Sequence, residues 1–185
     1  MVIAVASQKG GAGKTSSTIS LAAGLARKGK RVLLIDIDSQ ANSSKVLLPE
    51  YPQIQKQHTV FTTILERNPL PRHATSVPNL EIVPSHILLS NTDAELTTAI
   101  DHREERLKRQ LDTIKTEYDY VFIDCPPTLS WLTINADKAI IVVSPGYFEL
   151  DSIVQITKTI REVRGLFNAA LSWLSLHHGR SDRQQ

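Results

Sequence analysis

Cysteine is almost absent from this sequence of 185 residues, because Cys125 is the single one. One cysteine cannot form an internal disulfide, which fits a protein of the reducing cytosol. The sequence also lacks any apolar run long enough to span a bilayer. The N-terminal segment lacks a basic leader, and glycines interrupt its apolar run, so no signal peptide is expected. We therefore expect a cytoplasmic protein.

Charge of one sign is not in large excess either. The formal net charge is +2, a balance that does not by itself indicate a nucleic-acid partner. The six histidines show no metal-ligand spacing, so no zinc site is expected. No combination of serine, histidine and aspartate suggests a hydrolytic triad. The length and the 41% share of apolar residues suit one globular domain.

Short buried strands are expected to alternate with helices along the chain. Apolar runs predict strands, and longer periodic segments predict helices. The predicted strands span residues 2–6, 31–35, 80–83, 120–123 and 139–143, and the predicted helices span residues 15–28, 59–67, 93–117 and 150–164. Residues 36–58 are polar and turn-rich, so they are expected to be mostly loop. This alternation predicts an α/β fold, with a mostly parallel twisted sheet and helices on both faces.

A glycine-rich segment, SQKGGAGKTSS, joins the first predicted strand to the first predicted helix. Glycines let backbone N–H groups approach a phosphate closely, and the helix N-terminus adds partial positive charge. Lys14 is placed to reach β- and γ-phosphates, the Thr15 hydroxyl to ligate Mg²⁺, and Ser16 to donate to the α-phosphate. A simple connecting turn would not need the Lys-Thr pair. The segment predicts a P-loop NTPase that binds a nucleotide through Gly10, Gly11, Ala12, Gly13, Lys14, Thr15 and Ser16.

Aspartates follow two of the predicted strands. Asp36 and Asp38 end the segment RVLLIDID, and alternation along an extended backbone places both side chains on the same side. Asp124 ends the segment YVFID, where a carboxylate can hold Mg²⁺ through water. Ordinary turn or helix-capping roles are the alternatives. The neighbouring Cys125 is expected to be a small buried residue and not a nucleophile.

The segment KGGAGKT, with a lysine at its start, resembles the deviant Walker A motif of the ParA/MinD family of ATPases, most closely that of Soj-like ParA partition proteins. The similarity continues through RVLLIDIDSQAN, YDYVFIDCPPTLS and IIVVSPGYFELDSI. It implies that Lys9 reaches across a nucleotide-sandwich dimer to the other subunit's phosphates. It also implies that Asp38 orients the attacking water and that Asp36 lies near the Mg²⁺ shell. The implied catalytic residues are Lys9, Lys14 and Asp38, and the implied metal-binding residues are Thr15, Asp36 and Asp124.

The chain departs from the family pattern at several places. Ser39 stands where proline is common and Ala41 where glycine is common, which is expected to change the mobility of this loop. Family members also continue further than this chain does. We therefore expect a ParA-like ATPase domain over residues 1–165, incomplete at its C-terminus, and an unassigned tail over residues 166–185. Leu166 to Leu176 is expected to form a helix that packs on the sheet, and a membrane-seeking amphipathic helix is the alternative.

The resemblance implies an ATPase that uses ATP and Mg²⁺, dimerises with ATP and hydrolyses it weakly until a partner stimulates it. Such proteins partition plasmids or chromosomes, or position large intracellular cargo such as carboxysomes. The implied partner is a ParB-like or other small activator. Non-specific DNA binding, and with it nucleoid association, is expected to be weak in this short chain, and no membrane is favoured. Two alternatives are a MinD-like membrane-cycling ATPase and a truncated remnant that binds nucleotide without hydrolysing it.

Overall fold

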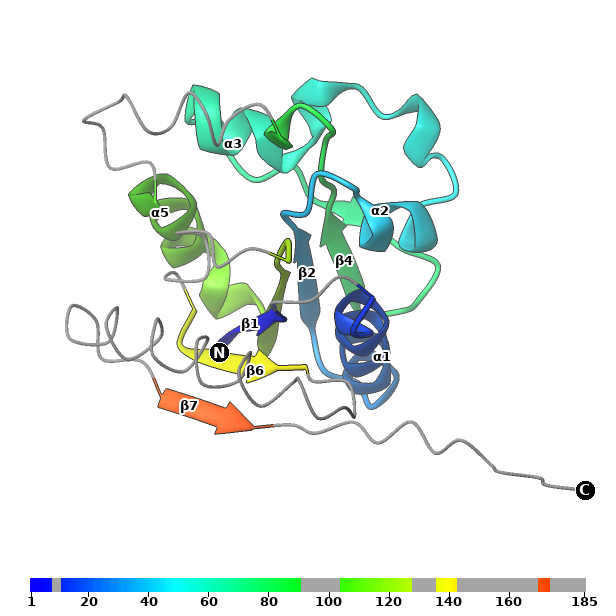
Figure 1. Ribbon diagram of the computed structural model, residues 1–185, viewed down its shortest axis with the longest axis vertical. Helices are drawn as coiled ribbons and strands as arrows, with labels where there is room; N and C mark the ends of the chain where they lie inside the picture. Colours follow the sequence, from blue (N-terminus) through cyan, green and yellow to red (C-terminus); the bar gives the residue numbers. More distant parts are fainter. Residues whose placement is uncertain (8–10, 91–103, 128–135, 143–169, 174–185) are drawn as a thin grey trace, which may run out of the picture.

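The computed structural model describes residues 1–7, 11–90, 104–127, 136–142 and 170–173. The strands in these segments are β1 (Val2–Ala6), β2 (Val32–Asp36), β3 (His73–Ala74), β4 (Leu80–Val83), β5 (Tyr120–Asp124), β6 (Lys138–Ile141) and β7 (Ala170–Trp173). They form one sheet in the order β3-β4-β2-β5-β1-β6-β7. Every neighbouring pair is parallel except β3 with β4. The predicted α/β fold with a mostly parallel sheet is confirmed (Figure 1).

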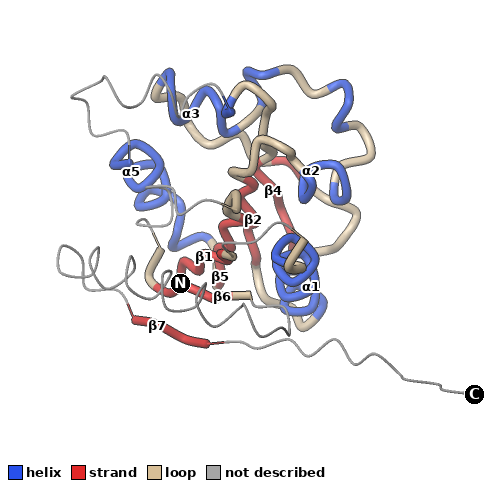
Figure 2. The backbone as a smooth tube through the Cα atoms, viewed as in Figure 1, coloured by secondary structure: helices blue, strands red, loops and turns tan. Residues whose placement is uncertain are grey.

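Helices cover both faces of this sheet, as Figures 1 and 2 show. The described α-helices are α1 (Lys14–Arg27), α2 (Asn42–Leu47), α3 (Val60–Glu66) and α5 (Glu104–Ile114). Side chains alternate between the two faces along each strand. Leu34 of β2 accordingly joins the apolar cluster that α1 and α2 cover, while Leu33 joins the cluster that α3 and α5 cover. None of the described helices has the length and apolar character needed to cross a membrane.

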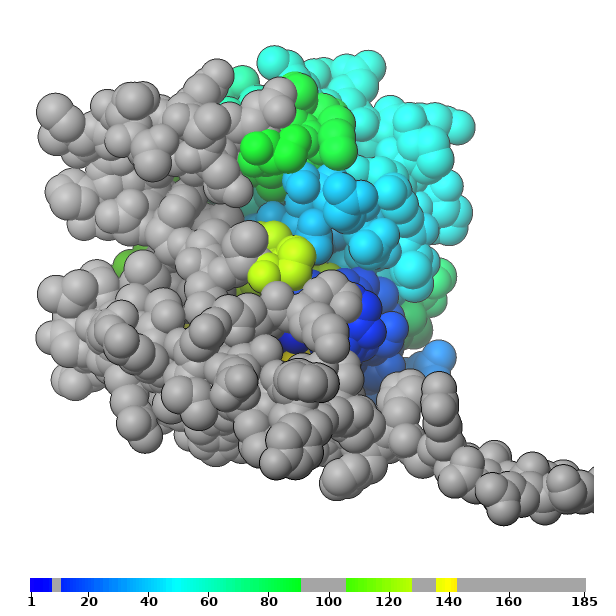
Figure 3. Space-filling model, in the orientation of Figure 1, coloured from blue at the N-terminus to red at the C-terminus, as the bar shows by residue number. Residues whose placement is uncertain are grey.

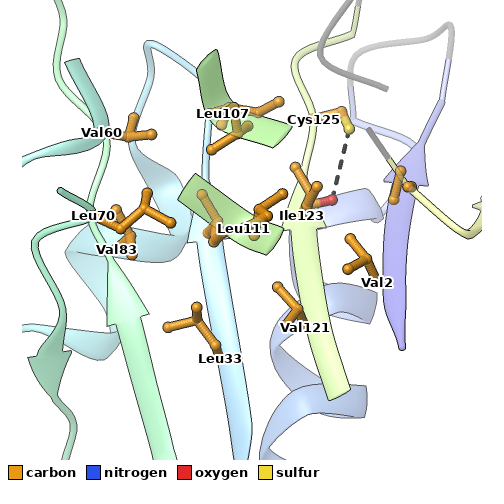
Figure 4. Close-up of a cluster of buried hydrophobic side chains, with 14 of the residues drawn as sticks. Val2, Leu33, Val60, Leu70, Val83, Leu107, Leu111, Val121, Ile123 and Cys125 are labelled. Carbon is orange, nitrogen blue, oxygen red and sulfur yellow. Dashed lines mark hydrogen bonds between the residues drawn. The ribbon is translucent and has the colours of Figure 1, made fainter. Parts of the chain in front are cut away.

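The cluster beneath α3 and α5 shows why these residues fold as they do. Leu107 and Leu111 are one helical turn apart on α5, and both belong to the buried cluster that contains the sheet residues Val121 and Ile123 (Figure 4). Both leucines are at most 2% exposed. Burial of such a side chain contributes about 1.5–3 kcal/mol. The two leucines therefore anchor α5 to the sheet through its apolar face.

Most of the predicted elements are confirmed with ends that shift by one or two residues. The predicted strand 139–143 is observed at Lys138–Ile141, and the predicted helix 59–67 at Val60–Glu66. The predicted helix 93–117 is confirmed at Glu104–Ile114, after which Lys115–Glu117 form a 3-10 turn. Residues 93–103 and the predicted helix 150–164 lie outside the described residues.

Two predictions are wrong, and one strand was missed. The expected loop 36–58 contains the helix α2 and two 3-10 turns, Tyr51–Gln53 and Lys56–His58. The expected helix at residues 166–176 is contradicted at Ala170–Trp173, which form β7 parallel to β6. The short edge strand β3 was not expected. α2 and β7 depend on neighbours that are distant in sequence, and β3 is only two residues long, so the local pattern alone did not indicate them.

Candidate functional site

Three parallel strands end side by side where the glycine-rich loop begins. In the sheet, β5 lies between β1 and β2. The register places Asp124 beside Asp36 on one side and beside Val5 on the other. Because parallel strands end at the same edge, their last side chains gather at this point. Figure 3 shows the segment that follows β5, in lime, at the surface between α1, in dark blue, and the region of α2, in lighter blue.

The glycine-rich loop turns directly into α1. Gly11 and Gly13 have φ angles of 78° and 84°, in the left-handed region that favours glycine. Gly13 precedes α1, and no side chain caps this helix N-terminus. The N–H groups of the first turn are therefore available to an anion. Residues 11–13 and the first turn of α1 therefore have a backbone geometry that suits phosphate binding.

Lys14 brings a buried positive charge to the carboxylates. Its Nζ lies 3.8 Å from Asp38 Oδ2 and 3.7 Å from Asp124 Oδ1. The residue is only 8% exposed, so water screens these attractions little. Three elements that are distant in sequence thus meet at one ammonium group.

Asp124 is fully buried, and its two oxygens have different surroundings. Oδ2 accepts a hydrogen bond from Ser43 Oγ at 2.7 Å. Oδ1 has no hydrogen-bond partner among the described residues, although it faces Lys14. Burial raises the pKa of this carboxyl, while Lys14, Ser43 and Thr15 oppose the rise. A buried carboxylate oxygen with no hydrogen bond is suited to a metal ion or its water shell.

Asp36 is fully buried beside Asp124. Its Oδ2 accepts hydrogen bonds from Ser44 N at 2.9 Å and Ser44 Oγ at 2.7 Å, and its Oδ1 accepts one from Asp38 N at 3.1 Å. Burial, and then the charge of Asp124, raises the pKa of Asp36 to about 7. Both oxygens therefore organise the turn that contains Asp38 and the start of α2.

Asp38 lies at the beginning of that turn. Its Oδ1 accepts a hydrogen bond from Gln40 N at 2.9 Å, and its Oδ2 faces Lys14. Ala41 follows with a φ of 52°, a left-handed conformation that costs a residue with a Cβ about 1–2 kcal/mol. A glycine would adopt this conformation without strain.

The structure therefore brings together most of the predicted site residues. Those around the buried charge cluster are Lys14, Thr15, Asp36, Asp38 and Asp124. Gly11, Ala12 and Gly13 form the loop before α1, and Ser16 is exposed in its first turn. Lys9 and Gly10 lie outside the described residues.

Sequence reasoning missed Ser43 and Ser44, which bind the two strand-end carboxylates from the start of α2. The signal available was a pair of adjacent small hydroxyl residues shortly after two aspartates. Residues 36–58 were expected to be mostly loop, so no helix was predicted that would bring these serines to the aspartates. For Cys125 the sequence interpretation is confirmed: the thiol is buried, and burial raises its pKa far above the usual range.

Comparison with known proteins gives the class to which this fold and site belong. The family model of the AAA domain matches residues 1–173. The sporulation initiation inhibitor protein Soj of Bacillus subtilis is 40% identical over 176 residues, covering 92% of this chain and 68% of Soj. The chain spans about two thirds of the length of curated relatives such as this one.

Solved structures of similar proteins have the same fold. A plasmid partition protein from Borrelia burgdorferi has a TM-score of 0.84 at 27% identity, over 100% of this chain and 82% of that one. A cobyrinic acid a,c-diamide synthase from Mycobacterium smegmatis, with bound ADP and magnesium, has a TM-score of 0.81 at 31% identity, over 95% of this chain and 73% of that one. The fold and the loop therefore define an AAA-type P-loop protein. Within that class, the chain belongs to the ParA/Soj family.

Proposed function

We propose that this chain binds ATP with Mg²⁺ and hydrolyses it as a ParA-type ATPase, in order to partition DNA or position another large cargo. The observation that supports this most is the buried contact of Lys14 with Asp38 and Asp124, directly after a glycine loop with positive φ angles. The family relationship supports the same activity. The magnesium and ADP of the Mycobacterium smegmatis structure support the choice of ligands.

Each charged side chain then has a role that follows from its position. The ammonium group of Lys14 binds the β- and γ-phosphates, and the N–H groups of the first turn of α1 bind their oxygens. Thr15 and Asp124 hold Mg²⁺, which when bound offsets the negative charge of the phosphates. Asp38 orients the attacking water. Asp36, whose oxygens accept hydrogen bonds from Asp38 N and Ser44 N, keeps Asp38 in place.

The proposal extends to assembly. Lys9 reaches the phosphates of a second subunit in an ATP-dependent homodimer. Turnover of the isolated protein is weak, and a ParB-like or other small activator raises it. The protein works in the cytoplasm, at the nucleoid where DNA binding is retained. These finer statements rest on the family relationship.

Substitution of Asp38 by alanine tests the proposed chemistry. We expect Asp38→Ala to bind ATP but to release phosphate at least about 100-fold more slowly, because the bound water loses its orienting carboxylate. Phosphate release and calorimetric ATP affinity are measured for the parent, for Asp38→Ala and for Asp112→Ala. Asp112 is a half-exposed aspartate of α5 whose partner is Lys115, and it serves as the matched control. Turnover by Asp38→Ala at the parental rate would refute this role.

A further inference from the structure

Two consecutive serines of α2 each hold one of the neighbouring strand-end carboxylates. Ser43 Oγ donates to Asp124 Oδ2 at 2.7 Å, and Ser44 Oγ donates to Asp36 Oδ2 at 2.7 Å. Both serines are 0% exposed. A hydrogen bond to an ionised carboxylate is short, strong and directional. The start of α2 is therefore fixed to the ends of both β2 and β5.

Ser43 determines how the carboxylate of Asp124 is turned. Because Ser43 occupies Oδ2, the other oxygen is directed to Lys14 Nζ at 3.7 Å. That oxygen, Oδ1, accepts no hydrogen bond from the described residues. Without a hydrogen bond to Oδ2, the plane of the carboxylate could turn about the Cβ–Cγ bond, and neither oxygen would be held toward the loop. The hydroxyl of Ser43 restricts that rotation by holding Oδ2.

We propose that Ser43 is a positioning residue of the Mg²⁺ site, because it holds Asp124 by Oδ2 and leaves Oδ1 available to bind Mg²⁺ or its water shell. The inference rests on the proposed function, since it assigns Asp124 to that metal. Groups that orient a metal-binding carboxylate are part of the site, and their loss typically lowers metal affinity 10–100-fold. Because Ser43 belongs to α2, the same bond also links the metal site to the turn that contains Asp38.

Ser44 offers a matched comparison at the adjacent position. It is equally buried and also donates to a carboxylate, but that carboxylate is Asp36. Its Oγ in addition accepts a hydrogen bond from Ser85 N at 2.9 Å, which connects α2 to the segment after β4. Loss of the Ser44 hydroxyl therefore disturbs the packing of α2 without releasing Asp124.

The experiment measures the calorimetric affinity for a non-hydrolysable ATP analogue with and without Mg²⁺. In Ser43→Ala we expect the affinity without Mg²⁺ to stay within about 2-fold of the parent, and the gain produced by Mg²⁺ to fall about 10-fold or more. Ser44→Ala should lose much less of this gain than Ser43→Ala, because the Ser44 hydroxyl holds Asp36 and not Asp124. Ser43→Thr, which retains the hydroxyl, should recover most of it. Urea unfolding of each variant shows that it is folded.

The outcomes distinguish failure of the proposed role of Ser43 from failure of the proposed Mg²⁺-dependent binding of ATP. If Mg²⁺ produces no gain in the parent, the proposed function fails and the inference fails with it. If the parent shows the gain and Ser43→Ala keeps it in full, only the inference is overturned. An equal loss in Ser43→Ala and Ser44→Ala also overturns it, because the effect would then come from disturbed packing of α2.

Discussion

Replacement of Lys14 by methionine tests whether this lysine holds the buried carboxylates together in the protein without nucleotide. Methionine keeps most of the apolar stem and removes the charge. With Nζ 3.8 Å from Asp38 and 3.7 Å from Asp124, each attraction amounts to about 4 kcal/mol at an effective dielectric constant of about 20. The cost of desolvating these charges offsets much of that sum. Removal of one partner from such a buried cluster destabilises a protein by about 3–5 kcal/mol.

The sign of the pH dependence makes this prediction sharper. Burial raises the pKa of Asp124, and Lys14 opposes that rise. In Lys14→Met the opposition is gone, so the pKa of Asp124 in the folded state rises further above its unfolded value. A raised pKa in the folded state means that the folded protein holds this proton more tightly than the unfolded chain does. The free energy of unfolding is therefore higher at low pH and falls as the pH rises through the folded pKa. Lys14→Met should therefore be about 3–5 kcal/mol less stable than the parent at pH 8, and much closer to it at pH 5.

Urea unfolding at both pH values, without nucleotide or Mg²⁺, measures this difference. Lys30→Met, which removes an exposed lysine beyond the end of α1, is the control and should change the free energy of unfolding by less than about 0.5 kcal/mol. Equal stability of Lys14→Met and the parent at pH 8 would refute the reasoning. A deficit of the same size at both pH values would show that lost packing, and not charge, is responsible.

Three further predictions follow from the same site and the family relationship. The pKa of Asp36 is raised to about 7, so the free energy of unfolding of the metal-free parent should fall as the pH rises from about 4 to about 7, by at most about 4 kcal/mol. Asp36→Asn should flatten that dependence in urea titrations. Lys9→Ala should keep ATP binding but prevent ATP-induced dimerisation, so a dimer seen by light scattering would contradict the proposed contact. Duplex DNA should bind weakly even with ATP, because no dense basic stripe is visible in a chain of net charge +2; tight binding with a steep salt slope would contradict this.

The strands and the phosphate loop could be predicted from the sequence because their signals are local. β1 and β2 are apolar runs that are buried throughout, and such runs indicate central strands of a parallel sheet. The loop is recognised by glycines and a Lys-Thr pair in consecutive positions. The strand-end aspartates were equally visible, because each directly follows an apolar run. That Asp36 and Asp124 lie side by side followed from the parallel arrangement that the alternation of elements implies.

The helix α2 could not be predicted, for a reason that the structure makes clear. It spans only Asn42–Leu47, and Ala41 before it provides no side-chain cap. A helix of this length is not stable by its own propensity. It forms because Ser43 and Ser44 bind carboxylates on β5 and β2, and Ser43 is 81 residues from its partner in sequence. The helix and the arrangement of the site therefore arise together, once the register has placed Asp36 beside Asp124.

The charges of the site also explain why it is poised to take up a cation. The described part of the cluster contains three buried carboxylates, Asp36, Asp38 and Asp124, and the single ammonium group of Lys14. Three negative charges and one positive charge leave an excess of two when all are ionised. The metal-free protein reduces this repulsion by raising the pKa of Asp36 to about 7 and by donating two serine hydroxyls. A divalent cation would remove the excess directly, so the repulsion among these carboxylates becomes part of the driving force for binding Mg²⁺.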